Sequence, residues 1–162
     1  KAAYGGTNPP TTSTDANWVK WRAGLLNSYM KKINKELKAI KPKLIVSMAP
    51  SVYPFSLNEY LQDWPTWVDS GWVDLILPQV YRYDINAYSA TLSQQKAYLK
   101  NNTSICYPGV LLKSGTYLPD DLFLTQMLQQ NRNQGFKGEC FFFYEGLKDK
   151  LSFFQNQYAF IK

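Results

Sequence analysis

The chain has 162 residues, carries a formal net charge of +6 and contains no histidine. This length is enough for one domain with a substantial core, and no stretch approaches the roughly 18 to 20 apolar residues of a membrane-spanning helix. Without histidine the chain cannot form a Ser-His-Asp or Cys-His nucleophilic site or the usual zinc sites, so catalysis would have to use carboxylates, tyrosine, lysine or cysteine. We therefore expect no membrane span, no metal and no cofactor.

Residues 1–16 are rich in Pro, Thr and Ser and are predicted to form an N-terminal loop segment. They lack the charged-then-apolar pattern of a signal peptide. A helix is predicted from about residue 17 to 40, with Thr14 or Asp15 as its N-cap and Lys41-Pro42 at its end.

The predicted helix over 17–40 carries apolar side chains three or four residues apart, and these are Trp18, Trp21, Leu25, Tyr29, Ile33, Leu37 and Ile40. This spacing places them on one face, which we expect to be buried. Lysines lie mainly on the other face or just beyond it, and these are Lys31, Lys32, Lys35, Lys38, Lys41 and Lys43. The favoured interpretation is a solvated helix face without a nucleic-acid partner, and the alternative is binding to a polyanion.

Four strand–helix units are predicted after the first helix. The strands are expected at 44–50, 73–81, 103–112 and 137–147, the helices at about 63–70, 85–101, 120–136 and 149–161, and a loop at 51–60. Apolar strands that alternate with amphipathic helices indicate an α/β fold with a parallel sheet covered by helices. The sheet is either an open doubly wound sheet or part of a (β/α)₈ barrel, since a complete barrel needs roughly 250 residues. No glycine-rich phosphate loop follows a strand, which disfavours nucleotide binding.

Functional side chains gather at the carboxyl ends of the strands in either architecture. The polar and aromatic candidates for substrate binding are Ser47, Tyr53, Gln79, Tyr81, Arg82, Asp84 and Tyr144. Gln79 and Tyr81 point the same way if the strand is regular, because side chains alternate along a strand. An ordinary hydrogen-bonded surface cluster is the alternative interpretation.

Glu145 is the sharpest catalytic candidate because it follows the apolar run CFFFY at a strand end. We expect it to be partly desolvated, as suits a general acid, or else to pair with an arginine such as Arg82. Glycoside hydrolysis ordinarily requires two carboxylates roughly 5 to 10 Å apart. The remaining candidates supply no convincing second one: Asp63 is a predicted helix cap, Asp74 lies at the wrong end of its strand, and Asp84 is in the right loop but is also suited to bracing Arg82.

Three segments in a fixed order resemble the family 10-like glycosyl hydrolase domain, a (β/α)₈ group common in bacterial envelopes. The segments are WVKWRAGLLNSYMKKINKELKAIKPKLIVSMAPSVYPF, YLQDWPTWVDSGWVDLILPQVYRYD and GFKGECFFFYEGL. The LQDW, QVYR and FFFYE forms most resemble cyanobacterial members. The resemblance covers nearly the whole chain after about residue 15. It implies that residues 17–162 form the C-terminal half of the barrel, strands five to eight, with an Asp-Asp motif for the second carboxylate upstream of this chain.

The resemblance also implies a function. The expected protein is a carbohydrate-active domain of the extracellular space or the cell envelope (periplasm), which hydrolyses glycosidic bonds of a bacterial or envelope polysaccharide. Glu145 would act as acid/base or orient the substrate, while Gln79, Tyr81 and Arg82 would line the cleft. The chain alone is expected to be inactive, and the alternative is a non-catalytic glycan-binding module. A half barrel has exposed strand edges, so we also expect either self-association through those edges or a larger protein that covers them.

Overall fold

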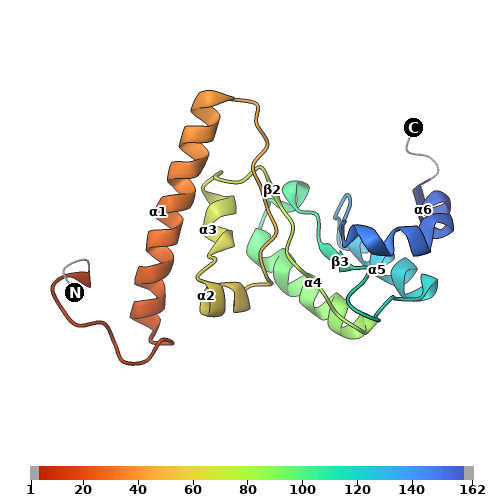
Figure 1. The fold of residues 1–162 in the computed structure, drawn as a ribbon, viewed down its shortest axis with the longest axis horizontal. Coiled ribbons are helices and arrows are strands. Elements are labelled where there is room, and N and C mark those ends of the chain that lie inside the picture. The colour runs from red at the N-terminus through yellow and green to blue at the C-terminus, as the bar shows by residue number, and fades with distance from the viewer. Residues whose placement is uncertain (1–3, 159–162) are drawn as a thin grey trace. The chain divides into compact units, whose positions relative to one another are not determined.

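The computed structural model describes residues 4–158, which form two compact units (Figure 1). The first unit comprises residues 4–46 and 53–74, and the second comprises residues 47–52 and 75–158. The chain thus passes from the first unit to the second and back before residue 75.

The first unit consists of three helices, α1 (Ala16–Ile40), α2 (Phe55–Tyr60) and α3 (Trp64–Asp69), and α1 contacts both of the others. The predicted first helix and its cap are confirmed, because the Asp15 side chain accepts a hydrogen bond from the Trp18 backbone N–H at 2.9 Å. Helix α2 occupies part of the segment that was predicted to be a loop. It is too short to show a helical period in the sequence, and Leu61 ends it in the left-handed conformation with φ 61°.

The buried face of α1 is not the face that the sequence predicted. Val19, Ala23 and Met30 are buried, whereas the side chains of Leu25 and Tyr29 are 55% and 60% exposed. A hydrogen bond of 2.6 Å from Trp67 Nε1 of α3 to Asn27 Oδ1 of α1 lies on the buried side. Asn27 thus meets the buried Trp67 of α3, so α1 turns this side towards α3 and not the side of Leu25 and Tyr29.

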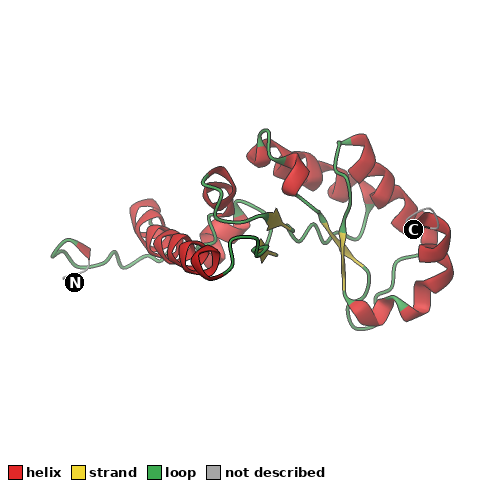
Figure 2. Cartoon of the chain, turned by 90° about the horizontal axis from the view of Figure 1, so that it is seen from above, coloured by secondary structure: helices red, strands yellow, loops and turns green. Residues whose placement is uncertain are grey.

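The second unit holds four short parallel strands, β1 (Ser47–Met48), β2 (Leu75–Ile76), β3 (Gly109–Leu111) and β4 (Cys140–Phe142). β1 pairs with β2 and β3 pairs with β4, while a parallel bridge between Ile76 and Cys106 connects the two pairs. Neighbouring strands therefore follow the order of the chain. This α/β arrangement, in which helices alternate with short strands (Figure 2), is compatible with part of a (β/α)₈ barrel.

Prolines explain why the strands are much shorter than predicted. Pro50, Pro78 and Pro108 lie in or beside the strand segments and have no N–H to donate to a ladder. Each still accepts through its carbonyl: Pro50 from the Gln79 N–H at 2.9 Å, Pro78 from Gly109 at 2.8 Å and Pro108 from Cys140 at 3.0 Å. The pairing thus continues past the named strands through these carbonyl groups.

The helices of the second unit are α4 (Ile85–Leu99), α5 (Asp121–Asn133) and α6 (Leu151–Tyr158), and the first two contact each other. Single 3₁₀ turns, η2 (Thr103–Ile105) and η3 (Tyr144–Gly146), replace the outer parts of the predicted strands 103–112 and 137–147. A further turn, η4 (Lys148–Lys150), precedes α6. Residues 159–161 of the predicted last helix lie outside the described residues.

Within residues 4–158, no helix combines the length and apolar character that crossing a membrane requires.

Candidate functional site

An aromatic pair lies at the carboxyl end of the strands of the second unit. The ring of Tyr81, beyond β2, stacks on Phe142 of β4, with centroids 5.5 Å apart and planes inclined by 28°. Phe142 also contacts Phe143, with centroids 5.3 Å apart. Phe142 is 48% exposed and Tyr144 is 84% exposed, so this aromatic surface is open to solvent. We call Gln79, Tyr81 and residues 142–145 the strand-end cluster.

Gly109 makes the Tyr81–Phe142 contact possible, because β3 lies between the strands that carry the two rings. A Cβ atom at this position would lie 2.9 Å from the Pro78 carbonyl oxygen and 3.2 Å from Tyr81 Cε1. Only glycine therefore lets the ring of Tyr81 lie over β3. Burial raises the pKa of the Tyr81 hydroxyl to about 12, with a smaller contribution from the Cys140 thiol, so this group is a neutral hydrogen-bond donor at ordinary pH.

Gln79 lies beside Tyr81 and connects two strands. Its Nε2 donates to the Ala49 carbonyl at 2.8 Å, and its backbone pairs with Ser51. Ser47, another predicted binding residue, pairs with Leu75 instead. Four residues along a strand separate the two levels, which is roughly 13 Å. The structure thus does not bring Ser47 together with Gln79 and Tyr81.

Arg82 and Asp84 attach α4 to the end of β2. Arg82 Nε donates to Thr91 Oγ1 at 3.0 Å, and its Nη1 donates to the carbonyl of Tyr81 at 2.7 Å. Asp84 caps α4, because its side chain accepts from the Ala87 N–H at 2.8 Å. Asp84 does not brace Arg82, and the polar atoms of both residues are held by α4 and the backbone.

Glu145 lies just beyond the carboxyl end of β4 and not within the strand. The chain leaves β4 after Phe142, and Glu145 lies in the turn η3, where its side chain is 50% exposed and pairs with Lys148 at 3.4 Å. The carboxylate is half exposed and its partner is Lys148, so the expected pairing with Arg82 is wrong. Gly146 of the same turn packs against Leu112, whose Cγ would lie 2.8 Å from a Cβ at that position, so a larger residue does not fit there.

The other carboxylates of the second unit all have structural contacts in the described part of the chain. Asp84 and Asp120 cap α4 and α5, and Asp121 and Asp149 pair with lysines. Glu139 is 2% exposed and pairs with Arg132. Glu145 is thus the carboxylate of the strand-end cluster. Among residues 4–158, no three His, Cys, Asp or Glu side chains form a group that could hold a metal ion.

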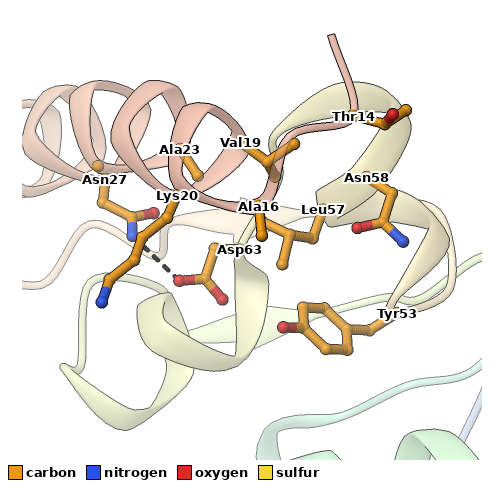
Figure 3. A pocket seen from close by; sticks show the side chains of 11 residues that line it. Thr14, Ala16, Val19, Lys20, Ala23, Asn27, Tyr53, Leu57, Asn58 and Asp63 are labelled. Carbon is orange, nitrogen blue, oxygen red and sulfur yellow. Dashed lines mark hydrogen bonds between the residues drawn. The ribbon is translucent and has the colours of Figure 1, made fainter. Parts of the chain in front are cut away.

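A second candidate site lies within the first unit, between α1, α2 and the start of α3 (Figure 3). It is a pocket of about 530 Å³. The residues that line it are Thr14, Ala16, Val19, Lys20, Ala23, Gly24, Asn27, Tyr53, Leu57, Asn58 and Asp63. We call it the α1–α2 pocket. It contains Tyr53, a predicted binding residue, and Asp63, which the sequence predicted to be a helix cap.

Asp63 occupies the N-cap position of α3, but its side chain makes no capping bond to the backbone. Its Oδ2 instead accepts from Thr66 Oγ1 at 2.6 Å and from Asn27 Nδ2 at 3.1 Å. Sequence reasoning missed this pocket because its walls come from segments far apart in the chain. The one local signal was Gly24, a glycine inside a long helix.

Comparison with known proteins gives one match. The family described as glycosyl hydrolase-like 10 matches residues 2–116. No curated protein and no solved structure matches the chain. The matched segment includes the α1–α2 pocket, Gln79 and Tyr81, and it ends before β4 and Glu145.

Proposed function

The chain belongs to the glycosyl hydrolase-like 10 family, and on this premise we propose that it engages the glycan in a glycoside hydrolase. The family indicates a carbohydrate-related function. The observation that carries the proposal is the solvent-open stack of Tyr81 on Phe142 at the carboxyl end of the parallel strands, where such folds place their sites.

The strand-end cluster has the chemistry that a sugar ring requires. Aromatic rings present flat apolar faces to the C–H face of a pyranose, and Tyr144 adds a ring that is 84% exposed. The Tyr81 hydroxyl donates to sugar oxygens. One N–H of the Gln79 amide donates to the Ala49 carbonyl, which leaves Oε1 to accept from a sugar hydroxyl and the second N–H to donate to a sugar oxygen.

In this proposal Glu145 is the acid/base or substrate-orienting carboxylate. It follows Phe142 by three residues, and a bound glycan would exclude water from it and displace Lys148. Hydrolysis requires a second carboxylate about 5 to 10 Å away. Because the other described carboxylates of this unit have structural contacts, a glycan-binding module without turnover is the second candidate.

Tyr81→Ala tests the proposed binding surface. The chain is titrated calorimetrically with peptidoglycan fragments and with oligosaccharides of α- and β-glucans. We expect saturable binding that weakens by about tenfold in Tyr81→Ala, the worth of one aromatic contact. Tyr83→Ala is the matched control, because Tyr83 is 69% exposed and contacts Tyr117 instead of Phe142. Equal losses in the two variants would contradict a sugar site at Tyr81.

Glu145→Gln separates the two candidate functions. A hydrolase loses turnover by at least about a hundredfold in this isosteric variant, with its glycan affinity nearly unchanged. A binding module binds the glycan in the parent chain and shows only a change of affinity in the variant. The measurement is release of reducing ends from the glycan that binds in the titration.

We further propose that the protein acts in the extracellular space or the cell envelope, and that copies of this chain self-associate through strand edges. Among the described residues β1 pairs with β2 alone, and the preceding Ile45 is 65% exposed. Sedimentation velocity should show concentration-dependent dimers that Ile45→Lys disperses. A monomer at all concentrations would contradict the self-association.

A further inference from the structure

The α1–α2 pocket has the properties of a small-molecule site. Its volume of about 530 Å³ lies within the range of roughly 300 to 1,000 Å³ that is usual for ligand pockets. Val19 and Ala23 of α1 and Leu57 of α2 supply apolar walls, and Tyr53 supplies an aromatic ring. In Figure 3 the Tyr53 ring, Leu57 and the Asp63 carboxylate converge on one space.

The carboxylate of Asp63 is held in place by contacts to one of its two oxygens. Asn27 Nδ2 and Thr66 Oγ1 both donate to Oδ2. Asn27 is itself fixed, since its Oδ1 accepts from Trp67 Nε1 at 2.6 Å, and Trp67 is 1% exposed. In the described part of the chain these bonds leave Oδ1 of Asp63 to accept from a ligand. The group is therefore preorganised, which lowers the entropic cost of binding.

Gly24 lines the pocket on the side of α1. A Cβ atom at this position would meet no atom within 4 Å, so packing does not require glycine there. Glycine inside a helix costs about 0.5–1 kcal/mol relative to alanine. The residue thus weakens α1, and the space beside it is open enough to admit a larger side chain.

The remaining polar groups of the pocket lining include both hydrogen-bond donors and acceptors. Asn58 offers an amide with both donor and acceptor atoms, and Lys20 offers an ammonium group. An apolar wall, an aromatic ring, a fixed carboxylate oxygen and these polar groups together suit a ligand with an apolar face and several hydroxyl groups.

We propose that the α1–α2 pocket binds a single pyranose ring, as a sugar subsite separate from the strand-end cluster. Asp63 Oδ1 accepts hydrogen bonds from ring hydroxyls, and the ring of Tyr53 packs against the C–H face. The choice of a sugar as the ligand class rests on the proposed function, while the pocket itself and its fixed carboxylate do not.

Two substitutions test the pocket without disturbing the fold. Gly24→Leu adds bulk where open space exists and improves helix propensity, and Asp63→Asn keeps an oxygen acceptor for Thr66 and Asn27 while it removes the charge. Ala39→Leu, at an exposed position of the same helix outside the pocket lining, is the matched control. The probes are methyl glycosides of glucose, galactose, mannose and N-acetylglucosamine, followed by saturation-transfer NMR and calorimetry on the full chain.

We expect one of these glycosides to bind the parent chain and Ala39→Leu equally. Gly24→Leu should abolish this binding, and Asp63→Asn should weaken it by about tenfold to a hundredfold, as expected for loss of a charged hydrogen-bond acceptor. Absence of binding by every glycoside would overturn the proposal, and so would binding that Gly24→Leu leaves intact.

Tyr81→Ala distinguishes this proposal from the proposed function. Binding that is lost in Tyr81→Ala but kept in Gly24→Leu places the sugar at the strand-end cluster, and overturns the pocket subsite alone. Binding that is lost in Gly24→Leu but kept in Tyr81→Ala supports the pocket, and overturns the strand-end cluster as the sugar site for that glycoside.

Discussion

The two ends of strand β4 carry carboxylates with opposite surroundings. Glu139 precedes the strand and is 2% exposed, whereas Glu145 follows it and is 50% exposed. Glu139 accepts from Arg132 Nη1 at 2.8 Å and Nη2 at 3.0 Å, from Asn131 Nδ2 at 3.2 Å and from the Tyr158 hydroxyl. Glu145 has one described partner, Lys148 at 3.4 Å.

This difference separates a strand end that serves stability from the end where we propose the glycan site. At the amino end, α5 and α6 supply donors that satisfy the buried charge, and Glu139 connects both helices to β4. At the carboxyl end, the chain turns away through η3 and leaves aromatic rings and one carboxylate in solvent. A division of this kind is typical of α/β folds, in which strand amino ends serve stability and carboxyl ends carry sites.

Removal of the Glu139 carboxylate should have the largest effect on stability. Glu139→Ala leaves Arg132, Asn131 and Tyr158 without their shared acceptor, and the free energy of unfolding should fall by about 3 kcal/mol. Glu145→Ala should change it by less than about 0.5 kcal/mol, because that pair is exposed. Urea unfolding measures both values, and similar losses in the two variants would show that the two ends do not differ.

Gly109→Ala should have the next largest effect. The added Cβ would lie 2.9 Å from the Pro78 oxygen and 3.2 Å from the Tyr81 ring, so strands must shift at a cost of about 2 kcal/mol. The same change should weaken glycan binding, since it displaces Tyr81 from Phe142. Gly24→Ala is the control and should instead stabilise the chain by about 0.5–1 kcal/mol. An unchanged free energy of unfolding in Gly109→Ala would show that the position of the Tyr81 ring does not require glycine at residue 109.

Tyrosine burial should make stability decrease at alkaline pH. The pKa of Tyr81 rises to about 12 in the folded chain because of burial, and burial raises the pKa of Tyr158 as well. The unfolded chain releases these protons near pH 10, before the folded chain does, so stability is lost as pH rises from about 10 towards 12. Tyr81→Phe should reduce this loss in urea unfolding measured across that range. An unchanged alkaline slope would contradict the burial of Tyr81.

The smallest expected effect concerns Asp74, which precedes β2 as Glu139 precedes β4. Its carboxylate accepts from Lys38 Nζ at 2.7 Å and the Val46 N–H at 2.8 Å, and the bond to Lys38 lowers its pKa. Because the folded-state pKa is the lower one, the stabilisation is present above about pH 4 and is lost as pH falls further. Asp74→Asn should flatten the acid side of the stability profile, by less than about 1 kcal/mol for such a partly exposed pair. If the variant loses stability just as steeply as pH falls, carboxylates other than Asp74 account for the acid dependence.

Several features could be predicted because they depend on neighbours in the chain. The caps Asp15 and Asp120 accept from backbone N–H groups three residues ahead, and the helices that they begin start within one residue of the predicted positions. The alternation of helices with parallel strands followed from the apolar pattern. Membership of the glycosyl hydrolase-like 10 family followed from motifs in a fixed order and is confirmed over residues 2–116.

The tertiary structure decided the features that depend on contacts between distant segments. The apolar period of α1 pointed to Leu25 and Tyr29, but α3 packs on the other side, where Asn27 meets Trp67. The sequence placed Glu145 at the rim of an apolar strand, yet the strand ends at Phe142 and Glu145 lies half exposed in the turn η3. Local hydrogen bonds are set by spacing along the chain. Burial and the α1–α2 pocket are set by which surfaces meet, and no single segment encodes that.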